Sequence, residues 1–164
     1  EFLELARKAS LQKKHLDLRE FITSLITPYQ SILEGRISFH LEFIGENFSL
    51  EADPAKLRTA LRNLLTNAIE AIPGKGTIWI KITSSQKQIV ISIKDSGRGI
   101  PPEALKQVFD LYFSTKEGGT GLGLPIARKI IEEHGGRLEI SSQELQGTEV
   151  TIILPKIPES STKK

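Results

Sequence analysis

The strongest periodic pattern in the chain covers residues 54–72, where apolar residues recur at spacings of three and four. This spacing predicts a helix with one buried face. Its apolar stripe consists of Leu57, Ala60, Leu61, Leu64, Leu65, Ala68, Ile69 and Ile72. Asp53 before Pro54 is typical of an N-cap followed by proline at the first helical position, and Pro73-Gly74 ends the segment.

Apolar and polar residues alternate in several other segments, which is the pattern of a strand with one buried face. Strands are predicted at residues 36–44, 48–51, 78–82, 89–93, 137–142 and 148–154. We expect the 48–51 strand to pair with the 36–44 strand across the turn at Gly45–Asn47.

Helices are also predicted at residues 1–14, 18–33 and 122–134, with a short one at 102–107. Asp17 is the expected cap of the second helix, which Pro28 interrupts. His134 closes the third, where a positive charge suits the helix dipole. Residues 95–120 form a long loop rich in glycine and polar residues, and such loops in compact domains are usually functional.

The order of these elements predicts an α+β fold with helices packed on one face of a sheet. The last residues, 158–164, are expected to be a frayed tail of Ser, Lys and other polar residues. The chain begins with Glu1 and contains no Met, so we interpret its 164 residues as a fragment of a longer protein.

Composition excludes only a few classes of function. Lys and Arg number 22 against 20 Asp and Glu, so the net charge of +2 gives no reason to expect nucleic acid as a partner. The absence of cysteine excludes disulfides and thiol catalysis in this chain. There is no run of about 18 apolar residues that would predict a membrane span. We expect a cytoplasmic domain, whether or not the parent protein is membrane-bound.

Three groups of residues carry candidate chemistry. The first is Asn63 and Asn67, which lie four apart and so share one face of the 54–72 helix, with Glu70 just beyond. Their amide oxygens are ligands of the kind that Mg²⁺ prefers. The alternative is that both are ordinary residues of a helix surface.

The second group follows a strand with three isoleucines and reads Asp95-Ser96-Gly97-Arg98-Gly99-Ile100. A carboxylate at a strand end can accept a hydrogen bond from an amine, while glycines let the backbone lie flat against a ligand. The alternative is a loop that only needs glycine for its conformation.

The third group is the run Gly118–Leu124, which opens the last helix. The first turn of a helix has unbonded N–H groups that suit a phosphate chain, and Lys116 upstream offers a cation. The run matches neither a Walker loop nor a Rossmann fingerprint. The alternative is a flexible linker that ends in a helix.

Together, these groups resemble the nucleotide-binding domain of sensor histidine kinases in the Bergerat (GHKL) superfamily, over roughly residues 36–155. The matching motifs are Asn63 and Asn67 (N box), Asp95, Gly97 and Gly99 (G1 box), Phe109 and Phe113 (F box), and Gly119, Gly121 and Gly123 (G2 box). Gly147-Thr148 and His134-Gly135-Gly136 are similar to further motifs of these domains. The resemblance implies a two-layer α/β sandwich with a mixed, mostly antiparallel sheet and a mobile ATP lid.

The resemblance also implies roles. Asp95 would bind the adenine amino group, and Asn67 with Asn63 would hold Mg²⁺ against the phosphates of ATP. The residues expected to contact nucleotide are Asn63, Asn67, Asp95, Gly97, Gly99, Ile100, Phe113, Lys116, Gly119, Thr120, Gly121, Leu122, Gly123 and Thr148. Glu70 stands where many of these kinases have Lys or Arg. The Asn-Ala-x-x-Ala pattern that starts at Asn67 and the Thr115–Gly119 lid sequence resemble the nitrogen-regulation type of sensor kinase, in which the lid lysine, Lys116 here, is expected to supply the missing charge.

Position 63 favours a kinase over an ATPase. Superfamily members that hydrolyse ATP carry a Glu four residues before the metal-binding Asn, as general base for water. Here that residue is Asn63, and an amide cannot activate water. Asn63 and Lys116 would then support transfer of the γ-phosphoryl group from ATP, which leaves ADP.

The phosphoryl acceptor is expected outside this chain. No H-E-x-x-N-P run occurs, and none of His15, His40 and His134 lies in such a context; His40 alternates with core residues and should face solvent. Residues 1–15 resemble the end of a dimerisation helix that would carry the acceptor further upstream, and residues 16–157 the catalytic domain. The expected partners are therefore those upstream helices and a response regulator. The full-length protein would be a homodimer, and the fragment itself could be a monomer.

Two other classes share the fold: anti-sigma-factor-type serine/threonine kinases and non-catalytic nucleotide-sensing modules. The amphipathic N-terminal segment counts against the first. Phosphoserine rather than phosphohistidine would favour the first, and nucleotide binding without transfer would favour the second.

Overall fold

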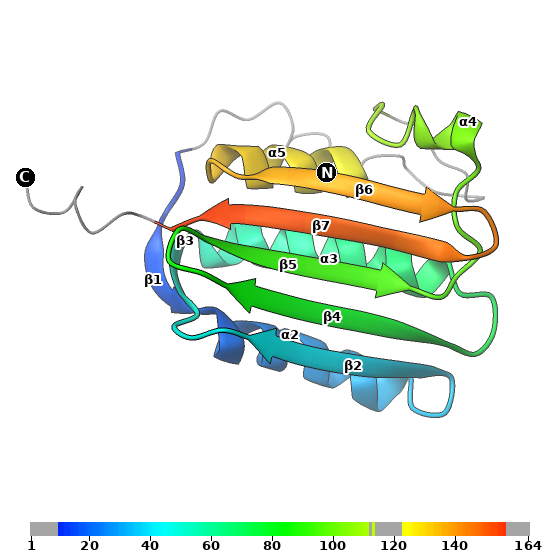
Figure 1. The fold of residues 1–164 in the computed structure, drawn as a ribbon, viewed down its shortest axis with the longest axis horizontal. Coiled ribbons are helices and arrows are strands. Elements are labelled where there is room, and N and C mark those ends of the chain that lie inside the picture. Colours follow the sequence, from blue (N-terminus) through cyan, green and yellow to red (C-terminus); the bar gives the residue numbers. More distant parts are fainter. Residues whose placement is uncertain (1–9, 112, 114–122, 157–164) are drawn as a thin grey trace, which may run out of the picture.

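A computed structural model describes residues 10–111, 113 and 123–156. Its main sheet has five strands in the order β2-β4-β5-β7-β6 (Figure 1). These are β2 (Ile37–Ile44), β4 (Gly76–Ser84), β5 (Gln88–Asp95), β6 (Arg137–Gln143) and β7 (Gly147–Pro155). The pairing of β2 with β4 is parallel and the other three pairings are antiparallel, so the mixed, mostly antiparallel sheet is confirmed.

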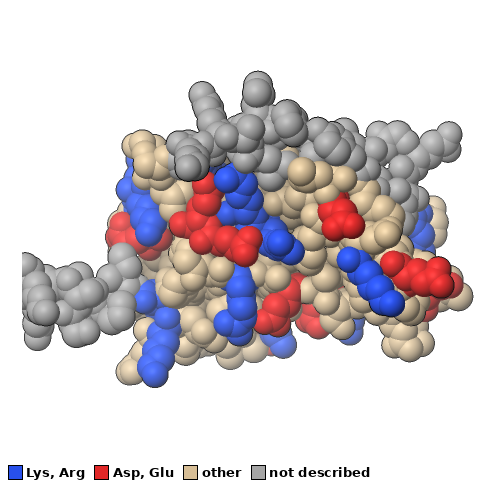
Figure 2. Space-filling model, turned by 90° about the horizontal axis from the view of Figure 1, so that it is seen from above, with Lys and Arg blue, Asp and Glu red and all other residues tan. Residues whose placement is uncertain are grey.

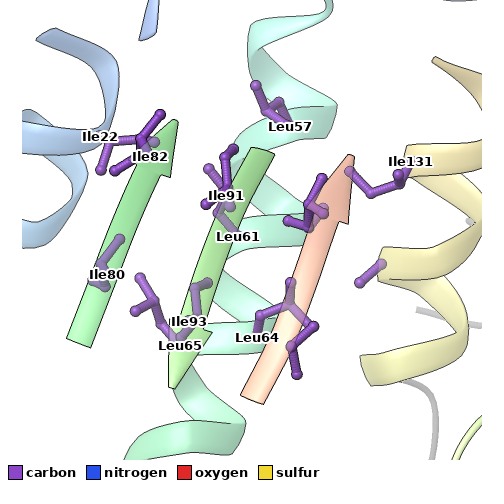
Figure 3. Close-up of a cluster of buried hydrophobic side chains, with 14 of the residues drawn as sticks. Ile22, Leu57, Leu61, Leu64, Leu65, Ile80, Ile82, Ile91, Ile93 and Ile131 are labelled. Atoms are coloured by element: carbon purple, nitrogen blue, oxygen red, sulfur yellow. The ribbon is translucent and has the colours of Figure 1, made fainter. Parts of the chain in front are cut away.

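Three helices cover one face of this sheet, and they lie behind the strands in Figure 1. They are α2 (Leu18–Ile32), α3 (Pro54–Glu70) and α5 (Gly123–Glu133), while the short α4 (Pro102–Leu105) lies at an end of the sheet. The core fills the space between the two layers: Leu61, Leu64 and Leu65 of α3 meet Ile91 and Ile93 of β5 (Figure 3). The predicted two-layer α+β fold is thus observed.

The predicted helix starts are confirmed by their caps. The Asp17 carboxylate accepts hydrogen bonds from the N–H groups of Arg19 and Glu20, and that of Asp53 accepts one from the N–H of Lys56 at 3.1 Å. Such caps each contribute about 1 kcal/mol because they satisfy donors that have no partner inside the helix.

The predicted pairing of 48–51 with 36–44 is wrong. β3 (Ser49–Ala52) instead pairs antiparallel with β1 (Lys14–Asp17), as a separate two-stranded sheet. In this arrangement Phe48 and Leu50 are buried in the core, and that burial of apolar surface favours the observed pairing.

The helix predicted for residues 1–14 does not reach its predicted end, because residues 10–13 have no regular structure and Lys14 begins β1. The pairing of β1 with β3, in which Leu16 lies opposite Leu50, outweighs the local preference of this segment for a helix. Residues 1–9 and 157–164 lie outside the described residues, so the dimerisation helix and the frayed tail remain predictions.

His134 also differs from expectation. It follows α5 as predicted, but it is buried, and its Nε2 accepts a hydrogen bond from the N–H of Asp53 at 3.0 Å. Its Nδ1 lies 2.8 Å from the Ile130 carbonyl oxygen and so carries the proton. The ring is neutral in this arrangement, and it joins two helices instead of balancing a dipole. His40 faces solvent as predicted and stacks on Trp79.

Charges of both signs occur on the surface of the described residues. Acidic and basic side chains are interspersed on the face shown in Figure 2, in keeping with the net charge of +2. Among the described residues, no helix is both long enough and apolar enough to cross a membrane.

Candidate functional site

The N-box asparagines lie where α3 meets the start of α5. The Asn63 side-chain N–H donates to the carbonyl oxygen of Gly123 at 3.4 Å. A side chain added at Gly123 would lie 3.9 Å from either amide atom of Asn67. Both amides are half-buried, so they border the first turn of α5, whose N–H groups point out of the helix end. The predicted convergence of Asn63, Asn67 and Gly123 is therefore observed.

Asp95 ends β5 and lies opposite Thr148 of β7. Its side chain is buried, and its Oδ1 accepts a hydrogen bond from the N–H of Gly97 at 2.8 Å. Burial raises the pKa of Asp95 above its usual value, although hydrogen bonds from the N–H groups of Gly97 and Thr148 oppose that rise. The carboxyl group is held in one orientation at a place where extra hydrogen-bond donors would be favourable.

The glycines of the Asp95 loop let it lie directly on the end of α3. A Cβ atom at Gly97 would collide with the carbonyl of Ala71, and the N–H of Arg98 donates to that same oxygen at 2.9 Å. The N–H of Ala71 in turn donates to the carbonyl oxygen of Asn67 at 3.0 Å. Asp95 and Asn67 therefore belong to the same end of the molecule, as a shared ligand would require.

Gly99, Ile100 and Thr148 support this loop. Gly99 has a φ of +69° and no room for a Cβ atom beside Gln143. The N–H of Ile100 donates to the Ser142 hydroxyl at 2.8 Å, and that hydroxyl lies 2.7 Å from the Thr148 hydroxyl. The Thr148 side chain thus holds the loop in place. Ser142 was missed because an alternating polar residue on a strand carries no signal of such a role.

The F box is only partly described. Phe109 packs against the core, and the guanidinium of Arg128 on α5 lies 4.7 Å from the centre of its ring. Phe113 is half-buried, and its N–H donates to the carbonyl oxygen of Asp110 at 3.3 Å. The lid residues Lys116, Gly119, Thr120, Gly121 and Leu122 lie outside the described residues. Arg128 was missed because its contact partner is 19 residues away in sequence.

The chemistry of the donors suits a hard cation bound jointly with phosphates. No cluster of three or more His, Cys, Asp or Glu side chains occurs in the described part of the chain. Mg²⁺ commonly uses one or two protein oxygens and completes its shell with water and phosphate oxygens. The two half-buried amides beside Gly123 fit that use, because the glycine leaves space in front of them.

Comparisons with known proteins agree with this geometry. Residues 52–158 match the family described as histidine kinase-, DNA gyrase B-, and HSP90-like ATPase. The sensor histidine kinase ZraS of Salmonella typhi is 38% identical over 160 residues, which cover 96% of this chain and 34% of that protein. Sporulation kinase C of Bacillus subtilis (strain 168) is 35% identical over 161 residues, covering 94% of this chain and 37% of that protein. The chain thus spans about a third of the length of these curated relatives.

Solved structures of similar proteins are also histidine kinases. The nucleotide-free catalytic domain of histidine kinase ThkA is 34% identical with a TM-score of 0.80, and the match covers 91% of this chain and 99% of that one. Histidine kinase ThkA in complex with the response regulator protein TrrA is 31% identical with a TM-score of 0.81, covering 96% of this chain and 46% of that one. This chain therefore belongs to the family of histidine kinase-, DNA gyrase B- and HSP90-like ATPases, as an ATP-binding catalytic domain of the sensor histidine kinase type.

Proposed function

We propose that this domain binds Mg·ATP at the end of the α3–α5 pair and donates the γ-phosphoryl group to a histidine outside this chain. The observation that carries the proposal is the convergence of Asn63, Asn67 and Asp95 at that end. Asp95 would accept a hydrogen bond from the adenine amino group. Asn67 with Asn63 would hold Mg²⁺, which neutralises charge on the phosphates.

Asn63 supports transfer to a protein acceptor rather than to water. Its side chain donates to Gly123 and has no basic atom, so it cannot take a proton from a water molecule. In the proposed step an imidazole nitrogen attacks the γ-phosphorus, the bond to the leaving ADP oxygen breaks, and the proton on the other imidazole nitrogen is released to water. The residues of this chain would then act by holding the nucleotide in line with the acceptor.

The acceptor would lie in a helical dimerisation segment of a longer, homodimeric protein, and a response-regulator aspartate would receive the phosphoryl group next. Two named relatives support this: ZraS is a sensor histidine kinase, and histidine kinase ThkA is solved with a response regulator protein. The domain itself would work in the cytoplasm.

Titration calorimetry tests the binding half of the proposal. ADP should bind the chain at least about tenfold more tightly with Mg²⁺ than with EDTA. Asn67→Ala should remove that Mg²⁺ dependence, whereas Thr66→Ala, one residue earlier and exposed, should keep it. Equal affinity with and without Mg²⁺ in the unmodified chain would exclude the proposed metal role.

Labelled ATP tests the transfer half. The chain alone should incorporate little label, and addition of the helical segment that precedes it in the full-length protein should give an acid-labile, base-stable phosphohistidine. Phosphoserine as the product, or binding with no transfer to that segment, would contradict the proposal.

A further inference from the structure

Three polar side chains form a row across neighbouring strands at the end of the sheet where β5 stops. Ser142 on β6 lies directly opposite Thr148 on β7, and Thr148 lies opposite Asp95 on β5. Side chains of directly opposed residues in antiparallel strands lie on the same face of a sheet. The Thr148 hydroxyl is therefore next to the Asp95 carboxylate, and Ser142 lies behind it, one strand further away.

Three short contacts converge on the Ser142 hydroxyl oxygen. It accepts a hydrogen bond from the N–H of Ile100 at 2.8 Å, lies 2.7 Å from the Thr148 hydroxyl, and lies 3.1 Å from the carbonyl oxygen of Gly147. A serine hydroxyl has one proton and two lone pairs. Since the N–H of Ile100 occupies one lone pair, the proton of Ser142 is directed either at Gly147 or at Thr148.

Only one of these two arrangements satisfies all three contacts. If Ser142 donates to the carbonyl oxygen of Gly147, its second lone pair can accept the proton of Thr148. If Ser142 donates to Thr148 instead, the oxygens of Ser142 and Gly147 face each other at 3.1 Å with no proton between them. The first arrangement is favoured for this reason. The Thr148 hydroxyl then directs its proton at Ser142 and offers only lone pairs to its other neighbours.

Asp95 is an acceptor as well. Its carboxylate accepts hydrogen bonds from the N–H groups of Gly97 and Thr148, and an ionised carboxylate has no proton to donate. A base that lies against Asp95 therefore meets two acceptors side by side, the carboxylate and the Thr148 hydroxyl. An amino group has two hydrogens and matches such a pair, whereas an oxo group brings a third acceptor.

We propose that Ser142 determines the base specificity of the nucleotide site. By fixing the Thr148 hydroxyl as an acceptor, it makes the site select a purine with an amino group at C6 over one with an oxo group there. This inference rests on the proposed function, which takes Asp95 as the residue that binds the base. Ser142 is a positioning residue that acts through Thr148. Without it, the proton of Thr148 can turn toward the base and donate to an oxo group.

Titration calorimetry with ADP and inosine diphosphate (IDP), both with Mg²⁺, tests this inference. IDP carries an oxo group where ADP has its amino group, and the unmodified chain should bind ADP at least about tenfold more tightly. In Ser142→Ala the ratio of the two affinities should fall by roughly 3- to 10-fold, which corresponds to one neutral hydrogen bond. A purely structural role of Ser142 would weaken both nucleotides by the same factor and leave the ratio unchanged.

Four further variants sharpen the result. Ser142→Thr keeps the hydroxyl and should keep the ratio, as should Ser141→Ala, the exposed neighbour on β6. Thr148→Val removes the second acceptor and should lower the ratio by a similar factor. Adding Ser142→Ala to Thr148→Val should change the ratio no further, as expected for two residues that act as one unit. Thr148→Val also tests the inference should Ser142→Ala not fold.

An unchanged ratio in Ser142→Ala or in Thr148→Val would overturn the inference, and so would an equal loss of the ratio in Ser142→Thr. Asp95→Asn keeps this failure distinct from failure of the proposed function. If Asp95→Asn weakens ADP binding while Ser142→Ala keeps the ratio, only the inference about Ser142 fails. If the unmodified chain does not bind ADP, or if Asp95→Asn binds it normally, the proposed function fails and this inference fails with it.

Discussion

The two ends of the antiparallel α3–α5 pair differ in how they use polar groups. At one end Asp53 donates its N–H to His134 and accepts from the N–H of Gln12, and the Lys56 ammonium lies 3.5 Å from the Glu133 carboxylate. At the other end, the asparagine amides border Gly123, whose missing side chain leaves room, and the glycines of the Asp95 loop lie tightly against backbone.

The first end fixes how the two helices lie along each other. The second end, about three turns away, presents amides and bare backbone to a ligand. Substitutions at the glycine end should therefore affect both the local backbone and nucleotide binding, whereas those at the bonded end should affect stability alone.

Gly147→Ala should have the largest effect on stability. Gly147 has a φ of +101°, and a Cβ atom there would collide with the carbonyl of Asp95. Strain and collision together should lower the free energy of unfolding by about 3 kcal/mol. Urea unfolding checks this against Gly35→Ala, because Gly35 has a similar φ of +83° but nothing within 4 Å. A loss no larger than that of Gly35→Ala would show that the contact with Asp95 does not matter.

Asp95→Asn should lower affinity for ADP by roughly 10- to 100-fold, the usual worth of a hydrogen bond to a charged group. The fold should not be weakened at neutral pH. Burial raises the pKa of Asp95, so the ionised carboxylate makes the folded state less stable as the pH rises through that pKa, and asparagine removes this cost. Calorimetry and urea unfolding on one sample separate the two effects. A variant that binds ADP normally would remove Asp95 from the proposed site.

This contrast between the ends also explains what could be predicted from sequence. The 54–72 helix and the glycine loop after Asp95 are local patterns, so periodicity and spacing were sufficient to predict that helix and the position of that loop at the end of a strand. The partner of the 48–51 strand depends on how Phe48 and Leu50 are buried, which is decided by distant segments. The bond from Asp53 to His134 joins residues 81 apart, and no local pattern could predict it.

His134→Leu should lower the free energy of unfolding by about 2 kcal/mol, since it leaves the buried N–H of Asp53 without an acceptor. Affinity for ADP should stay within about twofold, because the site is at the other end of α5. His40→Leu is the matched control: His40 is exposed, and the change should cost less than about 0.5 kcal/mol. A large loss of affinity in His134→Leu with little loss of stability would contradict the separation of the two ends.

Asp53→Asn should have the smallest effect, about 1 kcal/mol at neutral pH. Burial alone would raise the pKa of Asp53, but N–H groups of Gln12, Lys56 and Ala55 and the charge of Lys56 together lower it. The carboxylate accepts on both oxygens, from Gln12 at 2.9 Å and Lys56 at 3.1 Å, whereas an asparagine can accept on only one.

The direction of the pKa shift of Asp53 predicts how its contribution to stability changes with pH. A carboxyl group whose pKa is lowered on folding stabilises the protein fully above its ordinary value of 3.8, and this stabilisation is lost as the pH falls through the lower folded value. Protonated Asp53 then resembles the asparagine variant, so the difference between the two proteins should shrink toward zero in acid. Urea unfolding from about pH 7 to about pH 2.5 measures that difference. A gap that stays constant over this range would mean that the charge of Asp53 does not contribute to stability, and that its effect comes from the geometry of its hydrogen bonds alone.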